Sequence, residues 1–241
     1  MPNELDDSTA IVTGASSGIG RATAEALSAA GADIVLAARS EDRITALADD
    51  LETNALAVPT DVREEADVGA LVASTVNRFG GVDVLVNNAG LGRGSSVEDL
   101  STDEYRQMME TNVDGMFFTT RAALPHLRES EGTAIFIGSF AGEFPRSFNP
   151  VYAATKWAVR GFALSMEASL GPEGVAVTVV NPSEVRTEFG SALGEAFEER
   201  FDPGEATEPD EVAAAIGFAV RQGGSTVSEI DIYRRDKLGF F

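Results

Sequence analysis

Tyr152 and Lys156 lie four residues apart in the stretch VYAATKWAV, a spacing that could build an acid/base group. A tyrosine phenol titrates at a pH of about 10, so at neutral pH it is a poor base unless a neighbouring charge lowers its pKa. Residues four apart share one face of a helix, so the Lys156 ammonium would favour the phenolate. We therefore expect proton exchange with a carbonyl or alcohol oxygen. The alternative is an ordinary helix tyrosine beside a solvent-reaching lysine.

The charge of the chain narrows the choice of ligand. Lys156 and Lys237 are its only lysines. The chain has 18 Lys and Arg residues and 39 Asp and Glu residues, which gives a net charge of -21. Such a charge repels phosphate backbones and anionic lipid, so we expect a small-molecule ligand, no nucleic acid and no membrane partner. An acidic, lysine-poor surface also suits concentrated salt, which favours a halophilic source of the haloarchaeal type over an ordinary acidic cytosolic protein.

Cysteine and histidine are nearly absent. The chain has no cysteine and one histidine, His126, which excludes thiol chemistry and disulfides and leaves no pair of histidines for a metal. We expect no metal cofactor. The acidic N-terminus has no apolar core segment, and no run reaches the roughly 18 apolar residues of a membrane span, so we expect a cytoplasmic protein.

Strand-length apolar runs alternate with helix-length amphipathic segments along the 241 residues. This pattern predicts an α/β fold, in which helices cover both faces of a parallel sheet, and a single domain over residues 1–241. We expect strands at 9–14, 33–38, 55–62, 82–90, 133–139, 174–182 and 225–233. We expect helices at 19–31, 43–52, 66–80, about 102–128, and from about 149. We expect segment 183–210 to form a substrate lid. The alternative is an ordinary pair of surface helices.

The stretch TGASSGIG, residues 13–20, joins the first expected strand to the first helix. Its glycines let the backbone turn sharply and approach a ligand, and the helix N-terminus offers free N–H groups and a positive dipole end. The loop therefore predicts a pyrophosphate site, although its spacing differs from the common dinucleotide fingerprint and glycines also occur in plain turns. The expected cofactor contacts in it are Gly14, Ser16, Ser17, Gly18, Ile19 and Gly20.

Further motifs follow the other strands: DV at Asp61, NNAG at 87–90, NV at Asn112, Ser139, YAATK at 152–156 and NP at Asn181. With the glycine loop, they resemble the short-chain dehydrogenase/reductase family over essentially the whole chain. The resemblance implies one Rossmann-type, doubly wound parallel sheet of seven strands, a nicotinamide cofactor, NADP(H) or NAD(H), and a homodimer or homotetramer. The helices carrying Asn112 and Tyr152 would form the subunit contact, unless they only cover the sheet.

The resemblance also implies roles for individual residues. Tyr152 exchanges the proton, Ser139 hydrogen-bonds the same substrate oxygen, and Lys156 also holds the nicotinamide ribose. Asn112 orders a water relay from Lys156. The dinucleotide would further contact Asp61, Val62, Asn88, Ala89, Gly90, Pro182, Ser183, Val185 and Thr187. Ser183 stands where the family has glycine, so we expect the loop beside the carboxamide to be reshaped, because serine adopts positive φ less readily.

Arg39 follows the second expected strand, in LAARS. An NAD site places a carboxylate there for the ribose diol, whereas NADP needs a cation for its 2′-phosphate. Since a guanidinium matches phosphate and no carboxylate ends the strand, we expect NADP rather than NAD. The alternative is a solvated loop cation.

The crevice rim is expected to select the substrate, through Leu91, Phe140, Glu143, Phe144, Phe148 and Phe189 together with Ser139 and Tyr152. The mostly apolar set favours a hydrophobic ketone or alcohol over a sugar phosphate, unless these phenylalanines only pack the lid or a subunit contact. The sequence thus predicts an NADP-dependent oxidoreductase that interconverts a carbonyl and an alcohol, with Tyr152 as general acid/base. The alternatives are an NAD-dependent secondary-alcohol dehydrogenase and a non-catalytic dinucleotide-sensing protein.

Overall fold

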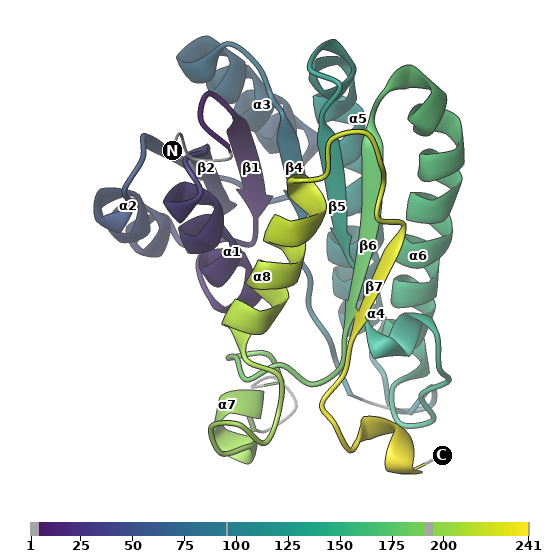
Figure 1. Ribbon diagram of the computed structural model, residues 1–241. Coiled ribbons are helices and arrows are strands. Elements are labelled where there is room, and N and C mark those ends of the chain that lie inside the picture. The colour runs from purple at the N-terminus through teal and green to yellow at the C-terminus, as the bar shows by residue number, and fades with distance from the viewer. Residues whose placement is uncertain (1–4, 95, 191–194, 241) are drawn as a thin grey trace.

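A computed structural model describes residues 5–94, 96–190 and 195–240, which form a parallel sheet between two layers of helices (Figure 1). The strands are β1 (Thr9–Thr13), β2 (Asp33–Ala38), β3 (Ala55–Pro59), β4 (Val84–Asn87), β5 (Thr133–Ile137), β6 (Ala176–Pro182) and β7 (Glu229–Ile232). The α-helices are α1 (Gly18–Ala29), α2 (Glu41–Asp50), α3 (Glu65–Phe79), α4 (Thr102–Met109), α5 (Gly115–Glu129), α6 (Pro150–Leu170), α7 (Phe197–Arg200) and α8 (Pro209–Val220). The expected doubly wound α/β fold is confirmed.

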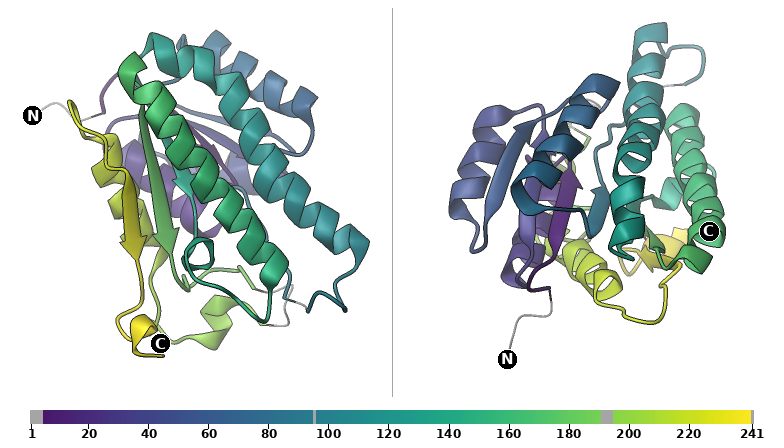
Figure 2. Two further views of the ribbon diagram at one scale, coloured as in Figure 1. Left: turned by 90° about the vertical axis from the view of Figure 1, so that its right-hand side faces the viewer. Right: turned by 90° about the horizontal axis from the view of Figure 1, so that it is seen from above.

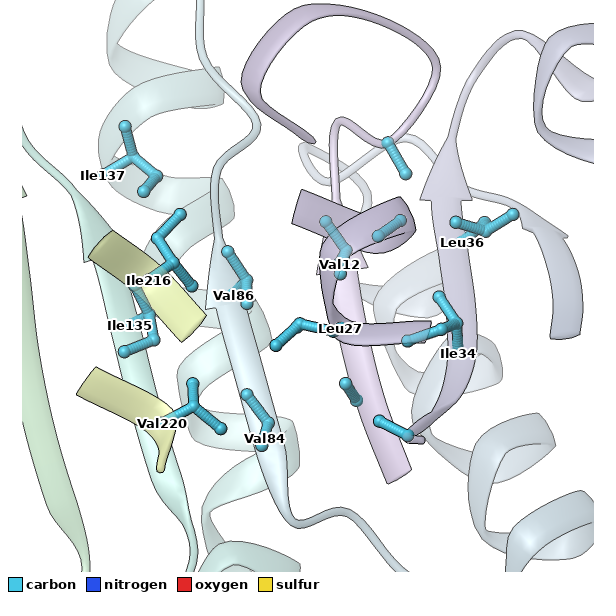
Figure 3. Close-up of a cluster of buried hydrophobic side chains, with 14 of the residues drawn as sticks. Val12, Leu27, Ile34, Leu36, Val84, Val86, Ile135, Ile137, Ile216 and Val220 are labelled. Atoms are coloured by element: carbon cyan, nitrogen blue, oxygen red, sulfur yellow. The ribbon is translucent and has the colours of Figure 1, made fainter. Parts of the chain in front are cut away.

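The helices bury one apolar core on each face of the sheet. Successive strand residues point to opposite faces, so Val12 belongs to one core and Ile11 to the other. Figure 3 shows the first core, to which α1 contributes Leu27 and α8 contributes Ile216. The second core includes the fully buried Phe136 and lies beneath α3, α5 and α6 (Figure 2). Burial on both faces explains the Val-, Ile- and Ala-rich strands.

Helix α8 is an element that the sequence pattern did not reveal. Pro209 occupies its first turn, and the side chain of Glu211 accepts a hydrogen bond from the backbone N–H of Glu208. Its Val212 and Ile216 are completely buried, and the helix packs against α1. Pro at the first position and a reciprocal cap are ordinary helix-start signals, so this helix could have been found.

The helix expected over about residues 102–128 runs without interruption from Thr102 to Glu129, with a π-helical turn, Glu110–Asp114, between its α-helical parts α4 and α5. Its start fits the sequence, because Ser101 accepts a hydrogen bond from the Glu104 N–H in a capping box. The π turn inserts a residue and reorients the side chains around it. Asn112 lies in this turn and is 2% exposed. The expected long helix is therefore confirmed, while the π turn at Asn112 was not predicted.

The sheet places the loops of interest at one edge. Its order is β3-β2-β1-β4-β5-β6-β7, so the winding reverses between β1 and β4. Ligands of such sheets bind outside the carboxyl ends of the strands at this reversal. In Figure 1 the strands point toward α7 and the C-terminal turn, Lys237–Phe240. Strands β3 and β4 end earlier than expected because residues 60–62 and 88–90 leave the sheet at this edge.

The segment after β6 forms a compact cover at the same edge. Arg186 holds it together: its guanidinium binds the Glu208 carboxylate at 2.9 Å and the backbone oxygens of Glu198 and Phe201. Within the described residues 183–190 and 195–210, the α-helical parts are α7 and the start of α8, so both the lid and the pair of surface helices stay predictions. Residues 191–194 of the expected lid lie outside the described part. No described helix is long and apolar enough to cross a bilayer.

Candidate active site

A crevice with a volume of about 900 Å³ lies at the carboxyl ends of the strands. Its walls contain every expected cofactor residue except Gly20, together with Ser139, Tyr152 and Lys156. These residues come from seven separate segments of the chain, and the reversal of the sheet brings those segments together. Asn112 does not line the crevice but lies behind its wall.

The glycine loop has the shape that a pyrophosphate requires. Gly14 and Gly18 have φ values of 66° and 54°, which L-residues with side chains rarely adopt. A Cβ on Gly20 would lie 2.3 Å from the Gly14 carbonyl oxygen, so only glycine lets α1 start this close to the loop. The Asn88 side chain donates to the carbonyl oxygen of Thr13 at 2.8 Å and fixes the loop to the end of β4. These residues therefore fit a dinucleotide at the N-terminus of α1.

Tyr152 and Lys156 lie in the first two turns of α6, where Pro150 occupies the first turn of the helix. The Lys156 ammonium lies 5.9 Å from the centre of the Tyr152 ring and donates a hydrogen bond to the Ile137 carbonyl oxygen at 2.8 Å. Lys156 is 6% exposed. The cation and the phenol therefore share one buried wall of the crevice.

Burial dominates the electrostatics of this pair. Removal from water raises the pKa of the Tyr152 phenol to about 12, while a hydrogen bond with Ser139 and the charge of Arg146 lower it. The sequence led us to expect a lowered pKa for Tyr152. That expectation is wrong, because the loss of water around the phenol raises its pKa more than the hydrogen bond and the nearby charge lower it. Burial also lowers the pKa of Lys156, to about 8. At neutral pH the phenol thus holds its proton, and Lys156 titrates close to neutrality.

Ser139 and Asn112 position this pair from two sides. Ser139 precedes a short 3₁₀ turn, Phe140–Gly142, and its hydroxyl accepts a hydrogen bond from the Ala141 N–H at 3.1 Å. The Asn112 side chain bonds both the N–H and the carbonyl oxygen of Leu91 at 2.8 Å, and it donates to the Thr155 hydroxyl at 3.0 Å. The π turn therefore ties the loop after β4 to the residue beside Lys156.

Ser183 does not strain the loop after β6. Among the described residues other than glycine, only Asp7 and Glu131 have positive φ, so Ser183 keeps out of the left-handed region that a glycine at this position could adopt. The Ser183 N–H donates to the Ile232 carbonyl oxygen at 2.9 Å, and its hydroxyl accepts from the Arg234 N–H at 3.0 Å. The hydroxyl thus anchors the C-terminal segment to this loop.

Arginines line the end of the crevice that lies next to the carboxyl end of β2. Arg39 lines it directly after β2, and the Asp61 carboxylate beside it binds Arg63 through paired hydrogen bonds. Arg43, which sequence reasoning missed, also lines this end and donates to both Glu188 carboxylate oxygens, at 3.1 and 2.9 Å. This contact joins α2 to the cover segment across the crevice.

Four of the six additional residues expected at the substrate rim line the crevice. Leu91, Phe140, Phe148 and Phe189 line the crevice, and the Phe189 ring lies 5.8 Å from the Tyr152 ring. Phe144 does not line it but stacks behind Phe140 at 4.3 Å, and Glu143 instead accepts a hydrogen bond from the Tyr233 hydroxyl at 2.7 Å. Sequence reasoning missed several charged or small lining residues: Gly92, Arg93, Arg146, Glu184, Arg200 and Lys237.

Known proteins match this chain over nearly its whole length. A protein-family model described as short chain dehydrogenase matches residues 8–197. An uncharacterized oxidoreductase of Staphylococcus epidermidis is 35% identical over 231 residues, which cover 95% of this chain and 98% of the relative. Uncharacterized oxidoreductases from Staphylococcus epidermidis and Staphylococcus aureus are among the relatives, and they give no support to the expected halophilic source.

Solved structures agree with this match. The alcohol dehydrogenase of the archaeon Thermococcus sibiricus, complexed with 5-hydroxy-NADP, superimposes with a TM-score of 0.86 at 30% identity and covers 95% of this chain and 97% of its own. A 3-ketoacyl-(acyl-carrier-protein) reductase from Brucella melitensis, complexed with NADH, also has a TM-score of 0.86, at 29% identity, with 95% and 97% covered. On the fold, the crevice and these matches, the chain belongs to the short-chain dehydrogenase family and is an oxidoreductase that uses a nicotinamide dinucleotide.

Proposed function

We propose that this protein is an NADP-dependent oxidoreductase that interconverts a carbonyl and an alcohol, with Tyr152 as the general acid/base. The observation that carries the proposal is the grouping of the Tyr152 phenol, the Ser139 hydroxyl and the Lys156 ammonium on the crevice wall beside the glycine loop. In the reducing direction the carbonyl carbon gains a hydride and its oxygen gains a proton. The reduced dinucleotide, when bound, supplies the hydride.

The side chains divide the proton chemistry between them. Because the pKa of Tyr152 is raised to about 12, the phenol is protonated at neutral pH and can give its proton to the carbonyl oxygen. The Ser139 hydroxyl hydrogen-bonds that oxygen and orients it. The Lys156 charge stabilises the phenolate that remains, and the ammonium would also hold the ribose. Asn112 acts as a positioning residue, because its bonds to Leu91 and Thr155 hold both walls around Lys156.

Arg39 is the group that we propose for the 2′-phosphate of NADP. It lines the adenosine end of the crevice, whereas Arg43 is already engaged by Glu188. Arg39→Gln removes a charge-assisted hydrogen bond, so we expect the KM for NADPH to rise about 10- to 100-fold while the KM for NADH changes little. Steady-state kinetics with both dinucleotides measure this directly.

The control for this variant is Arg21→Gln, which removes an arginine paired with Glu25 on the exposed surface of α1. It should leave both KM values unchanged. Equal effects of Arg39→Gln on the two dinucleotides would contradict the assignment and favour the NAD-dependent alternative, since one of the matched structures holds NADH.

We further propose that α5 and α6 form a subunit contact in a homodimer or homotetramer. Phe117 of α5 and Trp157 of α6 are 41% and 48% exposed, and Figure 2 shows these two helices side by side. Phe117 also packs edge-on against Phe162 of α6, so the two helices present a joint apolar face.

Salt should strengthen both the fold and this contact. Subunits with a charge of -21 repel one another, and the Debye length falls from about 10 Å at 0.1 M salt to about 3 Å at 1 M. Between about 0.1 and 2 M KCl we expect the melting temperature to rise by about 5 °C or more, with sedimentation shifting toward the oligomer. A melting temperature that falls, or a monomer at every salt concentration, would contradict this adaptation to salt.

A further inference from the structure

The charges that line the crevice oppose those of the whole chain. Of the 18 basic residues seven line it, and of the 39 acidic residues only three do. The basic residues are Arg39, Arg43, Arg93, Arg146, Lys156, Arg200 and Lys237, and the acidic ones are Asp61, Glu184 and Glu188. The described crevice thus has an excess of four positive charges in a chain with a net charge of -21. Such a local reversal creates a field that attracts anions.

The dinucleotide accounts for only part of this excess. Arg39, Arg43 and Lys156 lie where the adenosine and nicotinamide ends are assigned. Arg146 and Lys237 lie elsewhere, on the rim around Phe140. These two cations have no role in the proposed dinucleotide binding or proton transfer, although they lie in the same crevice.

Arg146 has unused hydrogen-bonding capacity. Its guanidinium lies over the rings of Phe148 and Phe140, at 4.7 and 5.4 Å, and its side chain is 21% exposed. Its nearest carboxylate oxygen, on Glu184, is 3.8 Å away, and the guanidinium donates no hydrogen bond to any part of the chain that the structure describes. Five N–H donors in a planar fork match a carboxylate. Both rings lie within cation–π distance of the guanidinium.

Glu184 does not neutralise this region. Its carboxylate forms an ion pair with Lys237, and the Arg234 guanidinium lies 3.7 Å from its other oxygen. The Arg234 guanidinium also forms an ion pair with the Asp236 carboxylate, at 3.1 Å. Glu184 is therefore engaged by Lys237 and lies near Arg234, while Arg146 approaches it only to 3.8 Å, beyond hydrogen-bond distance.

Arg146 lines the same crevice as the phenol that we propose as the proton donor. The charge of Arg146 is close enough to lower the pKa of Tyr152. Asn149, three residues after Arg146, lines the same wall, is 7% exposed, and has a buried side-chain oxygen without a partner among the described residues. Because amide oxygen and nitrogen positions are interchangeable by a flip, Asn149 can present a donor or an acceptor to a ligand.

We propose that the substrate is a keto acid or hydroxy acid whose carboxylate binds Arg146, with Lys237 adding to the field and the apolar part of the substrate against Phe148 and Phe189. This inference rests on the proposed carbonyl chemistry at Tyr152. It changes the expectation of a hydrophobic ketone or alcohol. The aromatic rings still line the crevice, but they surround a guanidinium that would bind a carboxylate.

Paired substrates test this subsite. Benzoylformate, acetoacetate and levulinate would each be compared with its methyl ester, which keeps the carbonyl and removes the charge. For at least one pair, the acid should have a kcat/KM about tenfold or more above the ester, and Arg146→Gln should lower kcat/KM for that acid about 10- to 100-fold while changing the ester less than about threefold. Arg235→Gln, at an exposed arginine of the C-terminal segment that does not line the crevice, is the matched control and should change neither.

A binding measurement separates failure of the subsite from failure of the proposed function. Benzoate and benzamide would be titrated calorimetrically into the protein with NADP present. Tighter binding of benzoate, lost in Arg146→Gln and kept in Arg235→Gln, supports the subsite even if no carbonyl compound is reduced, which would contradict only the proposed function. If the esters were reduced as well as the acids, or if benzoate bound no better than benzamide, the proposed carboxylate subsite would be wrong. Neither result would contradict carbonyl reduction at Tyr152.

Discussion

Tyr152→Phe is expected to lower kcat about a thousandfold while leaving the affinity for NADPH within about twofold of the parent, since general acid catalysis typically contributes 10²–10⁴. The variant deletes one oxygen from a half-buried ring that lies 5.8 Å from the Phe189 ring, so the packing should survive. Loss of the hydroxyl removes the group that bonds Ser139 and holds the transferable proton. NADPH oxidation with a reducible ketone measures kcat, and nucleotide fluorescence measures binding.

The chain offers a matched control for this variant. Tyr105, one of three tyrosines, lies on α4 and is 45% exposed. Tyr105→Phe deletes the same atom at the surface and should leave kcat unchanged. If Tyr152→Phe retained most of the parental kcat, another group would have to be the proton donor.

Lys156→Met is expected to lower kcat about 100- to 1000-fold, because it removes the charge that stabilises the Tyr152 phenolate and would hold the ribose. Unlike Tyr152→Phe, it should also raise the KM for the dinucleotide. A kcat loss without any change in that KM would contradict the ribose assignment.

The same variant reports the cost of burying the ammonium. Burial lowers the pKa of Lys156 from 10.5 to about 8, so below pH 8 the folded protein carries a charge that is better hydrated in the unfolded chain. Between pH 8 and 10.5 the unfolded chain binds the proton and the folded protein does not, so the free energy of unfolding rises with pH.

Chemical denaturation of the parent and the variant measures this rise. From about pH 7 to 9.5 the parent should gain about 2 kcal/mol relative to Lys156→Met, and other titrating groups cancel in the difference. A difference that does not change with pH would show that Lys156 retains its ordinary pKa in the folded protein.

Local patterns predicted the fold and much of the crevice. The alternation of strand-length and helix-length segments determined the sheet, because a parallel sheet needs helices on both faces. Gly14, Gly18 and Asn88 could be assigned since their roles depend on backbone shape close to a strand end. The helical position of Asn112 was predicted, but its π turn was not, because a single inserted helix residue leaves the apolar periodicity almost unchanged.

The missed residues depend on contacts between distant segments. Arg146, Glu184 and Lys237 are far apart in sequence and meet only when the C-terminal turn folds back over the loop after β5. One signal was present, since Lys237 is the other of the two lysines in the chain. The pKa of Tyr152 was predicted in the wrong direction because helical spacing reveals the neighbouring charge but not the depth of burial.

Transfer of a labelled hydride shows whether this protein reduces carbonyl compounds with Tyr152 as the proton donor. NADPH deuterated at the transferred position would be incubated with the protein and the keto acid and ketone panel, and the products analysed by mass spectrometry. We expect an alcohol that carries deuterium on the former carbonyl carbon, formed by the parent and by Tyr105→Phe but not detectably by Tyr152→Phe. NADPH that binds tightly yet yields no deuterated alcohol from any carbonyl compound would contradict this expectation and indicate a dinucleotide-sensing protein.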